Sequence, residues 1–316
     1  MYALSYEEVD KQVISLCNDE KFEEAVTKLE SVLDQFPNHL FEMTWDIAVL
    51  SSFMRPRNNE KIMAILEFGN SKGLWYSLNP QDKRWEECKD LVRFQKLVTE
   101  NANRKALAQE KAKKKSDVYL PKHYHQDQKY PLHICIHGWG EESAFFRKYW
   151  TSAGLENEYI CLFVQSSQVA TPIGYCWDDI EMARQEIIEA YQEVTSQYPI
   201  DMNHISLGGF SQGATMAMDI ALRGSIPVEG FIALCPDRPE DFDKEHIQSM
   251  RMKKIKGLIL TGENDGGLEE QKKMVHEFEK MNFPHDFIIN PNLGHWFPEN
   301  IDEQIDHGLN FIFFKV

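Results

Sequence analysis

The feature that most constrains this chain is a serine between two glycines, at the point where a strand-like run meets a helix-like run. Residues 204–207 are strand-like, the segment Gly-Phe-Ser-Gln-Gly at 209–213 follows, and a helix-like pattern begins directly afterwards. A strand that turns sharply into a helix strains the central residue of the turn, and the glycines let the neighbouring chain pass without a Cβ clash. This is the pattern of a nucleophile elbow, which exposes the hydroxyl of Ser211 over a sheet edge. Alone, it also fits an ordinary glycine-rich turn.

Two other parts of the chain carry residues that suit the same site. The apolar run Leu132–Ile136 ends in His-Gly-Trp-Gly at 137–140, as expected for a strand followed by a loop whose backbone N–H groups bind an oxyanion. Downstream, the apolar run 257–260 leads to Asp265, and His295 follows 30 residues later in the segment Asn-Leu-Gly-His-Trp. The chain order is therefore serine, aspartate, histidine.

This order resembles that of the α/β-hydrolase superfamily. The Gly-Phe-Ser-Gln-Gly and His-Gly-Trp-Gly segments are similar to those of the carboxylesterase, acyl-protein thioesterase and dienelactone hydrolase groups, which are small and largely lidless esterases. The resemblance covers about two thirds of the chain, from near Val118 to the C-terminus. It implies hydrolysis of a small-molecule carboxylic ester or thioester through an acyl-enzyme, with no cofactor and no metal.

In this interpretation Ser211 is the nucleophile, His295 takes its proton and returns it to the leaving group, and Asp265 fixes the histidine tautomer. A serine hydroxyl is a poor nucleophile at neutral pH, so the mechanism requires a base, and histidine suits both halves of the cycle. The backbone N–H groups of Trp139 and Gln212 are expected to hold the oxyanion.

Other acids compete for the role of Asp265. Asp265 lies in a glycine-rich turn that also contains Glu263. Asp237 follows the preceding strand-like run, where some relatives place the acid. The strand-like run before Asp265 comes later in the chain than the one before Asp237, which favours Asp265 as the acid.

Other histidines compete with His295. Only His295 lies in a glycine-flanked, aromatic-rich loop before the final helix-like run, whereas His285 and His307 are typical of surface or packing positions. His123 and His125 form a His-x-His pair, but they have no acidic or cysteine partner at a spacing useful for a metal. We therefore interpret that pair as part of a loop.

Aromatic residues close to these motifs are candidates for a substrate pocket. We expect Trp177 and Trp296 to line it, although packing within the loops is the alternative role. Further aromatic residues in the same segments are Trp139, Tyr175 and Phe297. The stretch 237–256 leaves room for a short helical flap at most, which predicts an open cleft and substrates of modest size.

Composition limits the partners and the compartment. A net charge of −16 argues against a broad surface for nucleic acid, and the one basic cluster, Lys111–Lys115, is typical of a solvated helix end. No apolar run is long enough to span a membrane, and no basic segment followed by an apolar stretch marks a secretory signal, so we expect a cytoplasmic protein. The six cysteines lack Cys-x-x-Cys spacing and fit reduced core thiols.

The chain is predicted to form two domains, 1–115 and 116–316. The first lacks strand-like runs and begins with a capping box at Ser5 and Glu8, which predicts a helix over 5–18. An amphipathic helical stripe is expected over 21–36, as one part of a helical hairpin that resembles a single tetratricopeptide repeat. Asn79-Pro80 is expected to start a long helix. This domain could serve intramolecular packing, dimerisation or peptide binding.

The second domain is predicted to be an α/β fold with a doubly wound, mostly parallel sheet, because strand-like and helix-like segments alternate. The expected strands are 132–136, 160–164, 205–207, 230–234, 257–260 and 286–289, and the expected helices are 179–197, 212–223, 269–281 and 303–314. In such sheets ligands bind beyond the carboxyl ends of the strands.

Two other functions are compatible with the serine, aspartate and histidine pattern. A serine peptidase of the prolyl-oligopeptidase type has the same residues in the same order, but such enzymes usually bring a β-propeller, whereas the partner domain here is helical. A noncatalytic binding protein on a hydrolase fold is the third alternative.

Overall fold

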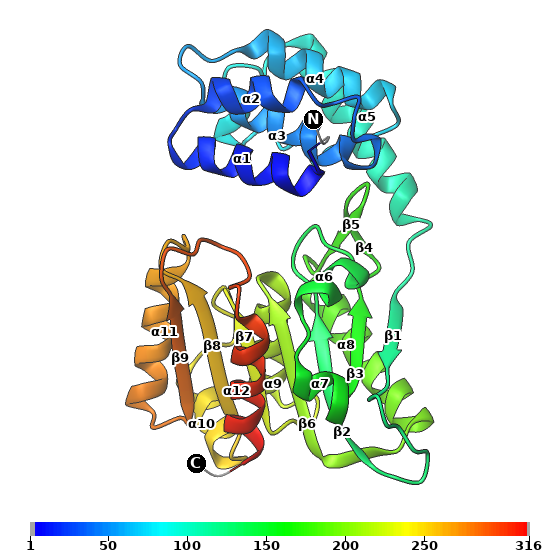
Figure 1. The fold of residues 1–316 in the computed structure, drawn as a ribbon, viewed down its shortest axis with the longest axis vertical. Coiled ribbons are helices and arrows are strands. Elements are labelled where there is room, and N and C mark those ends of the chain that lie inside the picture. Colours follow the sequence, from blue (N-terminus) through cyan, green and yellow to red (C-terminus); the bar gives the residue numbers. More distant parts are fainter. Residues whose placement is uncertain (1–3, 315–316) are drawn as a thin grey trace. The chain divides into compact units, whose positions relative to one another are not determined.

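The computed structural model describes residues 4–314 and divides into two compact units (Figure 1). The first unit comprises Met1–Lys111 together with Ala170–Ile173, and the second comprises Ala112–Val169 and Gly174–Val316.

The helical unit is built from five α-helices in the described residues. They are α1 (Tyr6–Asn18), α2 (Phe22–Glu30), α3 (Leu40–Phe53), α4 (Asn59–Ser71) and α5 (Val92–Gln109). The capping box is confirmed, because the Glu8 N–H donates to Ser5 Oγ at 3.2 Å and the Ser5 N–H donates to Glu8 Oε2 at 2.7 Å. The tetratricopeptide resemblance stays a prediction.

Two helix predictions in this unit are corrected. The helix expected over 21–36 ends at Glu30, and a turn fills the distance to the short 3-10 helix Pro37–His39. The long helix expected from Pro80 is interrupted. Asp82 caps a 3-10 helix at Lys83–Trp85, turns follow, and α5 begins only at Val92. Periodicity alone missed this break because Trp85 is fully buried in the same core as α5.

The second unit, called the α/β unit below, contains a seven-stranded sheet in the order β1-β3-β2-β6-β7-β8-β9. Its strands are β1 (Lys115–Tyr119), β2 (Tyr130–Ile136), β3 (Ile160–Gln165), β6 (Ile200–Phe210), β7 (Gly230–Leu234), β8 (Lys256–Gly262) and β9 (His285–Asn290). All neighbours pair in parallel except β1, which runs antiparallel to β3 at the sheet edge. The predicted mostly parallel α/β fold is confirmed. Sequence reasoning missed β1 and the two-stranded sheet of β4 (Gln168–Thr171) and β5 (Gly174–Cys176).

Helices cover both faces of the sheet (Figure 1). One face packs against α8 (Ile180–Gln197), α9 (Gln212–Arg223), α10 (Lys244–Met252) and α11 (Leu268–Lys280), and the other against α6 (Ser143–Tyr149), α7 (Ala153–Glu158) and α12 (Ile301–Phe313). Successive side chains of a strand point to opposite faces, so Ile134 joins one core and Cys135 the other. Helix α10 occupies the stretch considered for a flap, but its Ile247 and Met250 are buried in the core, so it is part of the helical layer.

Two compositional expectations can be compared with the described residues. The six cysteines form no disulfide there, and five of them are buried. Across 4–314, no helix is long and apolar enough to cross a membrane.

Candidate active site

The turn between β6 and α9 holds Ser211 in a strained backbone conformation. Its φ of 54° and ψ of −121° lie outside the regions that residues with a Cβ normally adopt. The flanking glycines permit this turn. A Cβ on Gly209 would lie 2.5 Å from the carbonyl of Gly213, and a Cβ on Gly213 would lie 2.2 Å from the carbonyl oxygen of Ile136. The local sequence therefore dictates the elbow.

Three side chains from separate strand ends form one line of hydrogen bonds. His295 Nε2 lies 2.8 Å from Ser211 Oγ, and His295 Nδ1 lies 2.8 Å from Asp265 Oδ2. Ser211 follows β6, Asp265 follows β8, and His295 follows β9. The Asp265 side chain is 2% exposed and that of His295 is 47% exposed, so the carboxylate is buried behind an accessible imidazole. The structure brings together the three residues that the sequence analysis selected.

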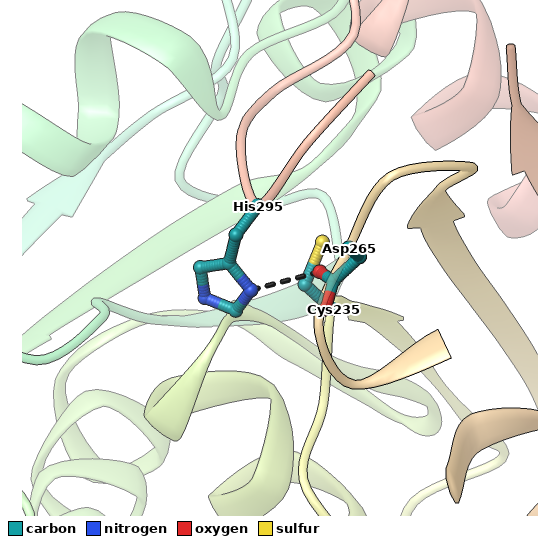
Figure 2. A group of neighbouring side chains, drawn as sticks. All are labelled: Cys235, Asp265 and His295. Atoms are coloured by element: carbon teal, nitrogen blue, oxygen red, sulfur yellow. Dashed lines mark hydrogen bonds and ion pairs between the residues drawn. The ribbon is translucent and has the colours of Figure 1, made fainter. Parts of the chain in front are cut away.

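The side chains of Asp265, His295 and Cys235 lie close together, and a hydrogen bond joins Asp265 to His295 (Figure 2). The Gly267 N–H donates to Asp265 Oδ1 at 2.6 Å, and the thiol of Cys235 is a further donor. Burial raises the pKa of Asp265, but the Cys235 thiol, the Gly267 N–H and His295 together outweigh it and hold that pKa below its usual value. The carboxylate therefore stays ionised beside the imidazole.

Cys235 was not selected from the sequence as a site residue. It lies at the end of β7, is 1% exposed, and has a positive φ of 53°. Burial and the hydrogen bond to Asp265 raise the pKa of its thiol, so the thiol stays protonated and donates. Cys235, Asp265 and His295 have potential metal-ligand atoms within 4.8 Å of one another, but both nitrogens of His295 are engaged in hydrogen bonds, with Asp265 and with Ser211.

The competing acids have other partners. Glu263 Oε2 accepts the N–H of Asn292 at 2.9 Å and so shapes the loop that carries His295. Asp237 is exposed, and its N–H donates to Thr215 Oγ1 at 2.9 Å. Among the described residues, neither carboxylate forms a hydrogen bond with His295.

The other histidines also lie elsewhere. His307 Nε2 pairs with Asp286 at 2.7 Å, and His285 Nδ1 bonds to the Phe283 carbonyl at 2.7 Å. The backbones of His123 and His125 both bond to the hydroxyl of Tyr130. None of these four side chains joins the site.

Two backbone N–H groups, one in the elbow and one in the loop that packs against it, have no acceptor in the described part of the chain. They belong to Trp139, in the loop after β2, and to Gln212, the first residue of α9. The Gln212 side chain is held away from its own N–H, because its Oε1 accepts the Trp177 N–H at 2.7 Å and its Nε2 donates to Asp178 Oδ1 at 2.9 Å. The helix dipole of α9 adds to the positive potential of this N–H.

The expected role of Trp177 as a pocket wall needs correction. Trp177 is only 1% exposed, and its Nε1–H donates to the His137 carbonyl at 2.9 Å. It supports the loop after β2 from within the core. Trp296 is 44% exposed and Trp139 is 48% exposed, so both are free to contact a ligand. Trp296 packs edge-on against Tyr149 and Phe210, with ring centroids 5.6 and 6.1 Å apart.

The chain resembles known proteins. Residues 124–265 match the phospholipase/carboxylesterase family. A structure of an uncharacterized protein from Bacillus cereus is similar over 98% of this chain and 99% of that one, at 25% identity and a TM-score of 0.56. The structure of esterase PE8 is similar over 63% of this chain and 99% of its own, at 17% identity and a TM-score of 0.50. No curated protein sequence matches the chain.

The Bacillus cereus protein matches along nearly the whole chain, helical region included, whereas the likeness to esterase PE8 extends over 63% of it. The family match supports hydrolysis of esters. Together with the parallel sheet and the order of its strands, it establishes that the chain has a carboxylesterase-like α/β-hydrolase fold.

Proposed function

We propose that this protein is a serine hydrolase that cleaves carboxylic ester or thioester bonds through an acyl-enzyme. The observation that carries the proposal is the continuous line from Ser211 Oγ through both nitrogens of His295 to Asp265, with 2.8 Å at each step. A base within hydrogen-bond reach of a nucleophile, itself oriented by a buried carboxylate, is the arrangement that activates a serine hydroxyl.

The first half of the reaction forms the acyl-enzyme. Ser211 Oγ attacks the carbonyl carbon while its proton passes to His295 Nε2, and the carbonyl oxygen becomes an oxyanion that the N–H groups of Trp139 and Gln212 stabilise. The bond to the leaving group then breaks, and His295 returns the proton to the departing alkoxide or thiolate. The ionised Asp265 stabilises the imidazolium that exists between these two proton transfers.

The second half releases the acid. A water molecule gives one proton to His295 and attacks the acyl carbon, again forming an oxyanion at the same two N–H groups. Collapse breaks the bond to Ser211, whose oxygen recovers the proton from His295. No redox step or bound cofactor is needed for this cycle.

The exposed indoles favour substrates with an apolar group. Trp139 carries one proposed oxyanion donor on its backbone and a largely exposed ring on its side chain. Trp296 directly follows His295 in the chain. An acyl or alcohol group that reaches the serine would cover part of these rings, which stabilises binding by burial of apolar surface.

The test uses the full chain, a fluorophosphonate probe and p-nitrophenyl esters of increasing acyl length. We expect covalent labelling and ester turnover by the wild type, and loss of both in Ser211→Ala. Ser196→Ala is the matched control, because Ser196 is an exposed serine of the same unit whose hydroxyl donates to the Glu193 carbonyl of its own helix. Thioester and aminoacyl-anilide substrates in the same panel separate esterase, thioesterase and peptidase activity.

A wild type that is neither labelled nor active on any ester would contradict the proposal and favour the noncatalytic alternative. Activity on anilides alone would favour the peptidase alternative. Equal labelling of wild type and Ser211→Ala would place the nucleophile elsewhere.

A further inference from the structure

The loop after β2 has an almost complete set of internal hydrogen bonds. The N–H of Gly138 donates to Glu141 Oε2 at 2.8 Å, the N–H of Gly140 donates to the Tyr175 carbonyl at 2.7 Å, and the N–H of Glu141 reaches the Gly138 carbonyl at 3.4 Å. Within residues 138–141, only the N–H of Trp139 has no acceptor among the described residues. The loop is therefore held by every amide except the one proposed to contact the oxyanion.

Glu141 supplies a side-chain acceptor for this loop. The Tyr175 N–H donates to the Glu141 carbonyl at 3.0 Å and so holds the Glu141 backbone. From this position the side chain reaches back to Gly138. The carboxylate forms no ion pair with a Lys, Arg or His of the described chain. Burial raises the pKa of Glu141 to about 7, and the hydrogen bond from Gly138 opposes that rise.

A partly buried carboxylate without a cationic partner lowers the stability of the folded chain. Its presence here therefore points to a local role for its hydrogen bond. Among the described residues, the Glu141 carboxylate accepts one hydrogen bond, from the backbone N–H of Gly138. This makes a role in general stability a poor explanation, and it directs attention to what that N–H fixes.

The Gly138 peptide lies between Glu141 and the elbow. A Cβ at Gly138 would be 3.0 Å from Cδ1 of Phe210 and 3.2 Å from Glu141 Oε2. Phe210 is the residue before Ser211, so the carboxylate holds the loop against the segment that carries the nucleophile. The following peptide, which joins Gly138 to Trp139 and contains the Trp139 N–H, is held through its carbonyl by His137 Nδ1 at 2.8 Å.

We propose that Glu141 is a positioning residue that, by accepting the Gly138 N–H, presents the Trp139 N–H to the oxyanion formed at Ser211. This inference rests on the proposed function, because it assigns a task within the same acyl-transfer site. Glu141 itself does not touch the reacting atoms. Losing the acceptor frees the Gly138 peptide, so the next amide no longer points at the developing charge, and misplacement on the scale of an ångström costs up to about 10²-fold in rate.

The test compares three variants at Glu141 in the full chain. Glu141→Leu removes the acceptor at nearly equal volume, Glu141→Asp keeps the charge but shortens the reach, and Glu141→Gln keeps an oxygen that can accept the Gly138 N–H. Glu142→Leu is the matched control, since Glu142 is an exposed neighbour whose side chain makes no cap hydrogen bond.

We expect Glu141→Leu and Glu141→Asp to lower kcat by about 10- to 100-fold with KM within about twofold, whereas Glu141→Gln and Glu142→Leu stay within about threefold of the wild type. A trifluoromethyl ketone forms an adduct with the serine that carries a negatively charged oxygen. Its affinity should fall in Glu141→Leu by the same factor as kcat, which a merely structural role would not produce.

Unchanged kcat in both Glu141→Leu and Glu141→Asp would overturn the inference, as would a loss of kcat without weaker binding of the ketone. If Glu141→Leu does not fold by circular dichroism, Glu141→Asp and Glu141→Gln decide the matter: equal activity of the two contradicts it. Failure of the proposed function is distinguishable, because then the wild type itself shows neither ester turnover nor fluorophosphonate labelling.

Discussion

Asp265 in the α/β unit is buried and Asp46 in the helical unit is partly buried, and the surroundings of the two carboxylates are opposite. Asp265 accepts hydrogen bonds from His295, Gly267 and Cys235, and its pKa lies below the usual value. Asp46, on α3, has no hydrogen-bond donor among the described residues. Burial, then the carboxylates of Asp10 and Glu42, raise its pKa to about 7.

The difference shows that the groups around an aspartate decide whether its charged or its neutral form is favoured. Donors around a carboxylate favour its charged form, which can then orient and stabilise an imidazolium. Acids around a carboxylate favour its neutral form, so the charge becomes a liability of the helical unit as pH rises. Neither outcome follows from the identity of the residue.

The largest effect expected from this contrast is on turnover. Asp265→Asn should lower kcat by about 10³- to 10⁴-fold, because the amide no longer fixes the tautomer in which His295 Nε2 accepts the serine proton. Asp46→Asn should leave kcat unchanged. Steady-state kinetics on one p-nitrophenyl ester, with folding checked by circular dichroism, measures both. A comparable loss in the two variants would remove the functional side of the contrast.

The second effect is on stability. Asp219 on α9 is buried with Arg184 of α8, whose Nε and Nη2 lie 2.6 and 2.7 Å from the two carboxylate oxygens. Arg184→Met leaves this carboxylate with only the longer ion pair to Arg223, at 3.7 Å, and should cost about 3 kcal/mol in free energy of unfolding, because a buried charge then loses its bidentate partner. Urea denaturation measures the loss.

Arg93→Met is the control for Arg184→Met. Arg93 also forms a bidentate pair, with Glu67, but at the exposed surface of the helical unit, where solvent screens the attraction. We expect little change there. Equal destabilisation by both substitutions would show that burial does not set the value of these pairs.

The elbow could be predicted from the sequence because its cause is local. Gly209 and Gly213 are required by backbone contacts within the turn and with the adjacent strand, so the pattern and the structure have the same origin. Asp265 and His295 could be selected because each follows a strand, and parallel strands bring their carboxyl ends to one edge.

The residues that sequence reasoning missed act through packing between distant segments. Cys235 donates to an acid 30 positions away, and no local pattern marks a cysteine at a strand end as a donor. Trp177 is an aromatic residue close to the motifs, which favoured a place in the pocket, yet it is buried beneath the loop after β2. The sequence places Glu141 in the loop after β2. It does not indicate that the Glu141 carboxylate accepts the Gly138 N–H, because that contact depends on the backbone bridge between Glu141 and Tyr175.

The third effect tests the donors around Asp265 one at a time. Cys235→Ala removes the thiol hydrogen bond to the ionised carboxylate, which should raise the pKa of Asp265 and lower kcat by about tenfold, the equivalent of about 1.4 kcal/mol. The loss should grow as pH falls, since protonated Asp265 no longer supports the imidazolium. Cys235→Ser, which keeps a donor, should retain more activity. A pH profile of kcat for the three proteins is the measurement, and identical profiles would show that the thiol is not needed.

The fourth effect concerns the pH dependence of the helical unit. The titratable groups near Asp46 are Tyr6, Asp10 and Cys17 on α1 and Glu42 on α3. Because the pKa of Asp46 is raised to about 7 in the folded chain, the folded state binds a proton that the unfolded state has already lost between about pH 4 and pH 7. Stability from this residue is therefore complete below about pH 4 and is lost as pH rises through about 7.

Asp46→Asn removes that dependence, so at pH 8 the variant should be more stable than the wild type by about 2 kcal/mol, with the difference shrinking toward pH 5. Hydrogen exchange of peptides from α1 and α3 measures it locally, and Asp34→Asn, at an exposed position of the same unit, is the control. If Asp46→Asn instead speeds exchange at pH 8, Asp46 has a stabilising partner when ionised, and the contrast with Asp265 is one of degree. If exchange slows only at pH 8, the ionised form of Asp46 destabilises the helical unit, and the neighbours of each aspartate decide which of its forms the folded chain favours.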